Sequence, residues 1–104
     1  MNVFIALAKG ELGKGIEEYL QGYGIMVRLN GRPLQFKQRI GDRTFALMQS
    51  KDVPRYVAGM ADYGITGEDL VEDYHLDNGD ALKVVDKLGF GKADLVVFAK
   101  SGNP

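Results

Sequence analysis

The sequence predicts an α/β domain in which a mixed sheet is flanked by helices, because strand and helix signals alternate along the chain. Residues 3–8 form an almost unbroken apolar run, which is typical of a strand covered on both faces. An amphipathic helical pattern follows over residues 12–23. The chain has 104 residues, enough for one domain and too few for two, so we expect residues 1–104 to form a single α/β domain.

The middle of the chain predicts a β-hairpin and then a second helix. We expect strands over residues 34–38 and 44–48, joined by the turn signal at residues 40–43. Asp52 is expected to cap the second helix, and Pro54 lies in its first turn, where the missing N–H costs little.

The second half of the chain continues the alternation. Residues 61–65 predict a short strand, and Thr66 is expected to cap a third helix, with Asp69 completing an acidic variant of the capping box. Two more strands are expected over residues 82–88 and 95–99. The expected inner faces of the three helices are Leu12, Ile16, Tyr19, Leu20 and Tyr23 in the first, Val53, Val57 and Met60 in the second, and Leu70, Val71 and Tyr74 in the third.

The charge balance and the lack of cysteine exclude several classes of function. The chain has 13 basic and 14 acidic residues, and a net charge of −1 gives no electrostatic case for binding nucleic acid or an anionic membrane. Without cysteine there is no disulfide, thiolate metal site or cysteine nucleophile. No apolar run approaches the ~20 residues of a membrane span, and the apolar start lacks a signal peptide's basic leader and cleavage site. We therefore expect a cytoplasmic protein.

The histidine and the carboxylates give no sign of a metal or catalytic centre. His75 is the only histidine and has no carboxylate–histidine pattern of metal-ligand spacing, so we expect it to be solvated at a helix end. The pairs Glu68-Asp69 and Glu72-Asp73 are expected to be helix-start and solvent-facing charges. We predict no metal site in the chain, and its residues assign no catalytic group.

The segment Gly64-Ile65-Thr66-Gly67 is the strongest local sign of a ligand site. Glycine lets the backbone approach a ligand closely, and a helix that begins near Gly67 offers free N–H groups and a positive dipole end to an anion. The Thr66 hydroxyl can add a hydrogen bond. A tight strand-to-helix connection with an ordinary cap is the alternative, and a short glycine motif does not decide between the two.

Lys9, Gly10 and Arg32 are further candidates for contacts with an anion. Lys9 and Gly10 follow the first predicted strand, and ligands of α/β sheets bind at the carboxyl ends of strands. A lysine there can pair with a phosphate as a point charge. Arg32, in the turn at residues 30–33, suits bidentate phosphate contact or stacking on a base. A solvated lysine and a surface arginine are the alternatives.

Several segments resemble motifs of the ATP phosphoribosyltransferase family, whose members catalyse the first step of histidine biosynthesis. The longest is the run from Asp52-Val53-Pro54 to Leu70, which is similar to the family's "DVPxYVxxGxADLGITGxDxL". The resemblance covers nearly the whole chain in order. The other matching segments are residues 6–12 ("ALPKGRL"), 30–34 ("sxRxL") and 88–97 ("LGFGxCxLVVA").

The resemblance implies a fold related to type II periplasmic binding proteins, in which two α/β domains face a cleft. Residues 1–104 would be the first of these domains, with the second absent. It also implies a reaction in which N1 of ATP attacks the anomeric carbon of phosphoribosyl pyrophosphate and releases pyrophosphate, with Mg²⁺ assistance. By position, Lys9 and Arg32 become candidates for contacts with ATP or pyrophosphate, and Gly64 to Gly67 become part of the cleft wall.

Three departures from the family pattern bear on activity. Glu11 stands where the family usually has arginine, and Gln49 stands where an arginine commonly precedes the Asp-Val-Pro motif. The family's phosphoribosyl pyrophosphate loop, which lies beyond residue 104, has no counterpart in the chain. We therefore expect the amino-terminal part of an enzyme, inactive alone.

The expected partners follow from this incompleteness. We expect a homo-oligomer or association with the remainder of the enzyme, since an unpaired sheet edge tends to recruit another strand. The alternative is a non-catalytic small-ligand-binding or assembly module, or an excised or engineered fragment of the same fold.

Overall fold

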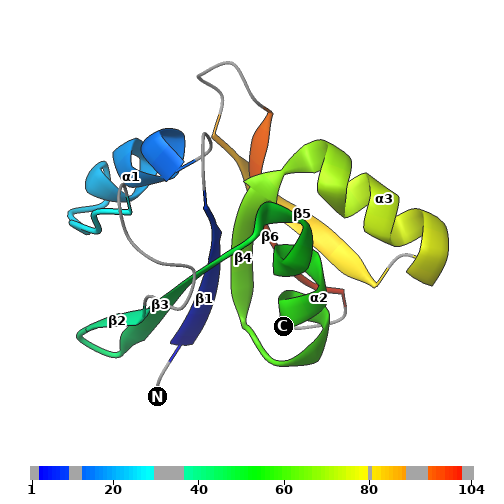
Figure 1. Ribbon diagram of the computed structural model, residues 1–104, viewed down its shortest axis with the longest axis horizontal. Helices are drawn as coiled ribbons and strands as arrows, with labels where there is room; N and C mark the ends of the chain where they lie inside the picture. The colour runs from blue at the N-terminus through cyan, green and yellow to red at the C-terminus, as the bar shows by residue number, and fades with distance from the viewer. Residues whose placement is uncertain (1–2, 10–12, 30–36, 80, 89–93, 102–104) are drawn as a thin grey trace.

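A computed structural model describes residues 3–9, 13–29, 37–79, 81–88 and 94–101. Strands and helices alternate within this part of the chain, which confirms the predicted α/β class (Figure 1). In chain order the elements are β1 (Val3–Ala8), α1 (Gly13–Gln21), β2 (Lys37–Ile40), β3 (Arg43–Met48), the 3-10 turn η1 (Ser50–Asp52), α2 (Val53–Gly59), β4 (Tyr63–Gly67), α3 (Glu68–Asn78), β5 (Leu82–Lys87) and β6 (Leu95–Lys100).

The six strands form one mixed sheet in the order β2-β3-β1-β4-β6-β5. The central strand β1 is parallel to both of its neighbours, so that Leu7 lies beside Leu47 of β3 and Ile65 of β4. The other three pairings are antiparallel. The carboxyl ends of β1, β3 and β4 therefore lie at the same end of the sheet.

The core is built around β1, as its unbroken apolar run predicts. Ala6, Leu7 and Ala8 are completely buried. Their neighbours on the flanking strands, among them Phe45 and Ile65, are buried as well. A strand with a partner on each side and covered faces has no position for a polar side chain, which explains why the sequence of β1 does not alternate.

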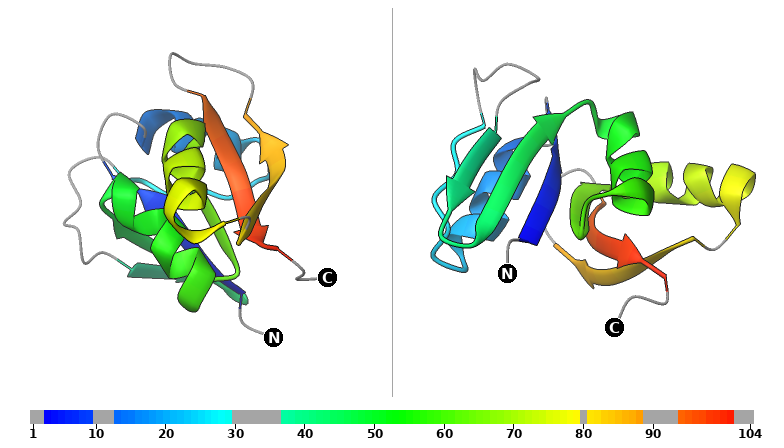
Figure 2. Two further views of the ribbon diagram at one scale, coloured as in Figure 1. Left: turned by 90° about the vertical axis from the view of Figure 1, so that its right-hand side faces the viewer. Right: turned by 90° about the horizontal axis from the view of Figure 1, so that it is seen from below.

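The helices cover both faces of the sheet. Phe98 on β6 lies against α2, whereas Leu95, three residues earlier on the same strand, lies against Gly15 of α1. Successive strand residues point to opposite faces, so α1 and α2 pack on opposite sides. The right-hand view of Figure 2 shows α1 well separated from α2 and α3.

Two of the residues predicted for the inner helix faces are in fact exposed. Ile16, Val57 and Val71 are buried as predicted, but Tyr23 is 66% exposed and Met60 is 68% exposed. The helices end earlier than the apolar periodicity suggests, because Tyr23 lies in the turn after α1 and Met60 leaves helical geometry with φ −142°. Of the other predicted inner residues, Leu12 lies outside the described part of the chain.

The largest differences from the predicted strand boundaries are at β2 and β4. The hairpin is confirmed, with its turn at Gly41, whose φ of 65° suits glycine. Its first strand is residues 37–40 rather than 34–38, of which residues 34–36 lie outside the described residues. Residues 61–65 were predicted as a strand, but β4 starts only at Tyr63, because the Ala61 N–H is used to close α2 on the Tyr56 carbonyl.

A hydrogen bond between side chains joins helix α1 to β5, the edge strand of the sheet. The Tyr19 hydroxyl donates to Asp86 Oδ2 on β5 at 2.8 Å, across 67 residues of sequence. Burial raises the pKa of Tyr19 above its ordinary value of 10.0, and the hydrogen bond with Asp86 raises it further. Tyr19 therefore stays a neutral donor at physiological pH and holds α1 on the sheet.

Asp62 joins β1 and β4 at the start of their pairing. Its backbone N–H donates to the Phe4 carbonyl at 2.8 Å, and its Oδ2 accepts the Phe4 N–H at 2.8 Å. The carboxylate thus takes the place of a strand carbonyl for a partner 58 residues away. We infer that Asp62 sets the register of these two strands.

We expect Asp62→Ala to lower the free energy of unfolding by about 1–2 kcal/mol, because the Phe4 N–H loses its acceptor. Urea denaturation at 25 °C measures the change. Asp73→Ala is the matched control, since Asp73 is exposed on α3; its effect should stay within about 0.5 kcal/mol. Equal effects of the two substitutions would contradict the role assigned to Asp62.

Gly64 allows α2 to pack directly on the backbone of β4. A Cβ atom at this position would lie 2.6 Å from Val57 Cγ2 and 2.8 Å from both Val53 Cγ1 and Phe98 Cζ. Real Cβ atoms do not approach neighbours so closely, so a side chain here would push α2 away from the sheet. Glycine is therefore required at residue 64 by packing.

We expect Gly64→Ala to lower the free energy of unfolding by about 1–3 kcal/mol through overpacking. Gly59→Ala is the matched control, because an added Cβ at Gly59 has nothing within 4 Å. That substitution should be neutral or stabilise the helix by up to about 1 kcal/mol. Urea midpoints distinguish the two variants, and a neutral Gly64→Ala would show that α2 adjusts freely.

Candidate functional site

The candidate site lies where the parallel strands end, at what we call the carboxyl rim: Lys9 after β1, Gln49 after β3 and Gly67 at the end of β4. The Lys9 N–H donates to the Met48 carbonyl at 2.8 Å, so the ends of β1 and β3 stay joined at the rim. Ligands of open α/β sheets bind at this end of the strands. The fold therefore brings Lys9 and Gly67, which are far apart in sequence, to the same end of the sheet.

The rim contains only part of the predicted set of site residues. Lys9 is half-buried directly after β1, where the sequence analysis placed it. Gln49, which stands where the family commonly has arginine, is exposed at the same rim. Gly10 and Arg32 lie outside the described residues, so their contact with a ligand stays a prediction.

Two residues of the predicted glycine turn have their places in the core. Gly64 is buried under α2, and Ile65 is 2% exposed between β1 and β6. They form the strand behind the rim rather than its surface. If Gly64 and Ile65 take part in binding, they do so by holding the position of the residues that follow them.

The prediction that Thr66 caps α3 is wrong. The N-cap residue is Gly67, with φ −69° and ψ 141°, and no side chain bonds to the helix start. Thr66 is still in β4 because it lies beside Val96 of β6, a pairing that carries the strand on to Gly67. The predicted capping box between Thr66 and Asp69 therefore does not form.

The Thr66 hydroxyl has a structural partner instead. Thr66 is completely buried, and its Oγ1 donates to the Ser50 carbonyl at 3.2 Å. The same carbonyl accepts the N–H of Val53 at the start of α2. This hydroxyl thus joins the end of β4 to the turn between β3 and α2 and fixes the shape of the rim.

The amino end of α3 is less open to an anion than the sequence suggests. The Glu68 N–H already donates to the Asp94 carbonyl at 2.7 Å. A Cβ atom on Gly67 would lie only 2.6 Å from Asp69 Oδ1, so this carboxylate folds back over the helix start. Glu68 and Asp69 already supply the negative charge that the positive end of the helix dipole favours.

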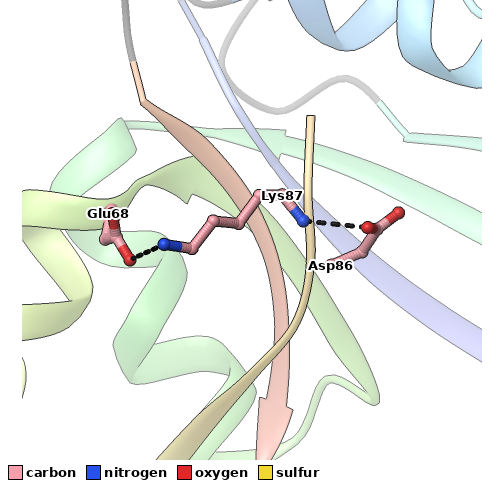
Figure 3. Close-up of polar contacts among 3 residues, drawn as sticks. All are labelled: Glu68, Asp86 and Lys87. Atoms are coloured by element: carbon pink, nitrogen blue, oxygen red, sulfur yellow. Dashed lines mark hydrogen bonds and ion pairs between the residues drawn. The ribbon is translucent and has the colours of Figure 1, made fainter. Parts of the chain in front are cut away.

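Lys87 is a cation near the rim that sequence reasoning did not identify. Its Nζ lies 3.3 Å from Glu68 Oε2, and its backbone N–H donates to Asp86 Oδ1 at 2.9 Å (Figure 3). The Lys87 side chain is 66% exposed, so the ion pair contributes little to stability. The residues of β5 come beside α3 only through the antiparallel β5–β6 pairing, which no local pattern predicts.

His75 is not solvated as predicted. Its Nε2 lies 2.9 Å from the carbonyl oxygen of Leu82, and the side chain is half-buried. The chain reverses after α3 at Gly79, which has φ 70°, and this brings the start of β5 back beside the last helical turn. Glu72 and Asp73, in contrast, are exposed as predicted.

The described residues lack two features, a metal cluster and a membrane-spanning helix. They contain no group of three or more histidine, cysteine, aspartate or glutamate residues that could hold a metal ion. Among the same residues, no helix has the length and apolar character needed to cross a membrane. The rim therefore offers a lysine, backbone groups and carboxylates as its chemistry.

Comparison with known proteins identifies relatives of this chain. Residues 49–104 match the family model described as HisG, ATP phosphoribosyltransferase. The chain is 36% identical over 101 residues to the ATP phosphoribosyltransferase of Agrobacterium fabrum (strain C58), which covers 91% of this chain and 44% of the relative. It is 38% identical over 80 residues to that of Bacillus cytotoxicus, covering 73% of this chain and 38% of the relative.

A solved structure has the same fold. The ATP phosphoribosyl transferase (HisG:HisZ) complex from Thermotoga maritima superposes with a TM-score of 0.63 at 23% identity, over 86% of this chain and 41% of that chain. The chain thus spans less than half the length of these relatives. The family model, which matches more than half of the chain, and the shared fold agree: the chain belongs to the ATP phosphoribosyltransferase family.

Proposed function

We propose that the chain is the amino-terminal part of an ATP phosphoribosyltransferase and supplies one wall of its substrate cleft. The observation that supports this most directly is the carboxyl rim of this family member. The parallel strands β1, β3 and β4 end there, at Lys9 and Gly67 among other residues. The reaction joins ATP to phosphoribosyl pyrophosphate and gives phosphoribosyl-ATP and pyrophosphate. Since the chain spans less than half of its relatives, the remainder of the enzyme would supply the opposite wall.

The proposed chemistry needs positioning and charge stabilisation rather than a nucleophilic side chain. N1 of ATP attacks the anomeric carbon, the bond from that carbon to the pyrophosphate oxygen breaks, and pyrophosphate leaves with the electron pair. Lys9 is placed to offset phosphate charge at the end of β1. We propose Gly10 and Arg32 for the same anion contacts by their resemblance to the family's motifs.

The charges at the rim divide it into two parts. Asp69 and the carbonyl of Asp94 lie at the amino end of α3 together with Glu68, whose charge is partly offset by Lys87, whereas Lys9 follows β1, the neighbour of β4. Carboxylates repel phosphates and accept hydrogen bonds from hydroxyl and amino groups. We therefore propose that the phosphates lie toward Lys9, and that the wall formed by Gly64, Ile65, Thr66 and Gly67 faces an uncharged part of a substrate.

Magnesium belongs to this proposal only as a companion of the substrates. Mg²⁺ is usually held by substrate phosphates with one or two carboxylates rather than by a cage of protein ligands. Carboxylates at the rim, such as that of Asp69 at the start of α3, are of the kind that this use needs. When bound, the ion would neutralise charge on the departing pyrophosphate.

The partners and location complete the proposal. We infer that the chain works as a homo-oligomer or with the remainder of the enzyme, and the solved neighbour, itself described as a HisG:HisZ complex, supports association. We also propose a cytoplasmic location, since a biosynthetic enzyme that consumes ATP needs access to it. Neither nucleic acid nor membrane is a proposed partner.

A second candidate function is a binding or assembly module without catalysis. The observation that favours it is Gln49, a neutral side chain exposed at the rim where the family commonly has an arginine. Glu11 stands in place of another family arginine and replaces a positive charge with a negative one. A module of this kind would give no turnover with any partner.

Isothermal titration calorimetry with ATP tests the proposed phosphate contact. We expect Lys9→Ala to weaken ATP binding at least about tenfold, because a charge-assisted contact contributes about 1.5–3 kcal/mol. Lys100→Ala is the matched control and should bind like the unchanged chain, since Lys100 ends the antiparallel strand β6 at the opposite end of the sheet. Equal affinities of both variants would contradict the role of Lys9.

An assay for phosphoribosyl-ATP separates the two candidate functions. The chain alone should give no product, and product should appear when the missing part of a relative is added. Turnover by the chain alone would overturn the proposal that it is incomplete. Absence of binding of both ATP and phosphoribosyl pyrophosphate would favour the assembly module.

A further inference from the structure

The two edge strands of the sheet differ in length and charge. β2 has only four residues, and its exposed side chains Lys37 and Arg39 are both basic. Short edge strands with positive charges resist pairing with another chain. β5 at the other edge has six residues, and five of them are exposed.

The exposed part of β5 combines apolar and oppositely charged side chains. Val84 is 38% exposed and Val85 is 48% exposed. They lie between Lys83 and Asp86, so the sequence reads basic, apolar, apolar, acidic. Such a sequence is self-complementary when it is read in the opposite direction, as in an antiparallel pair.

A β-bulge brings the two charged side chains to the same face of the sheet. Lys83 lies beside Ala99 and Asp86 beside Val97, and the register shifts between Val84 and Asp86. Ala99 and Val97 are two residues apart on β6, so they point to the same face. Lys83 and Asp86 therefore share that face, although two residues three apart on a regular strand would point to opposite faces.

The carboxylate of Asp86 is held in position from within the chain. Its Oδ2 accepts the Tyr19 hydroxyl at 2.8 Å, and its Oδ1 accepts the Lys87 N–H at 2.9 Å. A carboxylate has about four acceptor positions, so it can take a further donor. The strand thus carries a positioned negative charge beside the surface of α1.

We propose that β5 pairs antiparallel with β5 of a second copy, around a twofold axis through the Val84–Val85 bulge. Lys83 of each copy then lies opposite Asp86 of the other, and the four valines meet at the axis. Because a twofold axis repeats every contact, the arrangement contains two opposite-charge pairs. An antiparallel pair of two β2 strands would bring Lys37 and Arg39 of one copy close to the same basic residues of the other, and the like charges would repel each other.

This inference specifies the homo-oligomer in the proposed function but does not depend on the transferase reaction. Among the described residues β5 pairs with β6, and the proposed dimer would pair along the other side of β5. The bulge bends β5, increases its local twist and disrupts the ladder, which limits the pairing between copies to a few residues. We therefore expect a weak, concentration-dependent dimer.

Sedimentation velocity over a range of concentrations tests the dimer with two charge reversals. Lys83→Glu and Asp86→Lys each put like charges opposite each other at both pairs, so each should raise the dimer dissociation constant at least about tenfold. An equimolar mixture of the two variants should dimerise again, because every cross pair then joins a carboxylate to an ammonium group. Recovery in the mixture is specific to Lys83 facing Asp86.

Two control variants separate this contact from other effects. Tyr19→Phe removes one of the two internal donors to Asp86 and should leave most of the dimer intact, which distinguishes loss of this hydrogen bond from loss of the charge pair. Lys37→Glu changes the other sheet edge and should not alter the dissociation constant. Circular dichroism checks that every variant is folded, and ATP calorimetry on Lys83→Glu should match the unchanged chain even when dimerisation is lost.

Three results would overturn the proposal. The first is a monomer at all concentrations, and the second is a dimer that both charge reversals leave unchanged. The third is a pair of weakened variants whose mixture fails to recover, which would exclude the proposed register. Failure of ATP binding in the unchanged chain, in contrast, would contradict the proposed function and leave the dimer standing.

Discussion

The burial of β1 between two parallel partners is the constraint on which the rest of the structure depends. Ala6, Leu7 and Ala8 are inaccessible to solvent only because β3 and β4 flank them and helices cover both faces. The parallel pairing also places the ends of three strands at one rim. Asp62 maintains this arrangement from the other end of the sheet, where its backbone and carboxylate both bond to Phe4. The core and the candidate site therefore have a common origin.

Local patterns predicted the elements well and their long-range partners poorly. The bounds of β1 were predicted to the residue, since an apolar run ended by Lys9 is a local signal. The end of β4 was misplaced because its last residues pair with β6, which lies almost 30 residues further along the chain. His75 was misjudged for the same reason, since its partner Leu82 arrives only after the turn at Gly79. Helix ends were overestimated where an apolar residue follows the last turn, as at Met60.

The segment at residues 64–67 shows how residues that suit a ligand site can have packing roles. Gly64 is required by the close approach of α2, and Thr66 uses its hydroxyl on the Ser50 carbonyl. Glycine-rich sequence alone cannot distinguish such packing from approach to a ligand, because both need a position without a side chain. The rim could be expected from the alternation of elements, whereas the way in which the Asp69 carboxylate folds back over the start of α3 could not. Lys9 is half-buried at the same rim.

The position of β1 in the chain has a consequence for synthesis on the ribosome. β1 is synthesised before β4, and Phe4 bonds to a residue 58 positions later. At translation rates of about 5–20 residues per second, β1 would wait roughly 3–12 s for that partner. During this interval its apolar side chains are open to chaperones and to other nascent chains. Ala6, Leu7 and Ala8, which are completely buried in the folded structure, thus stay without their β4 neighbours until that strand has been made.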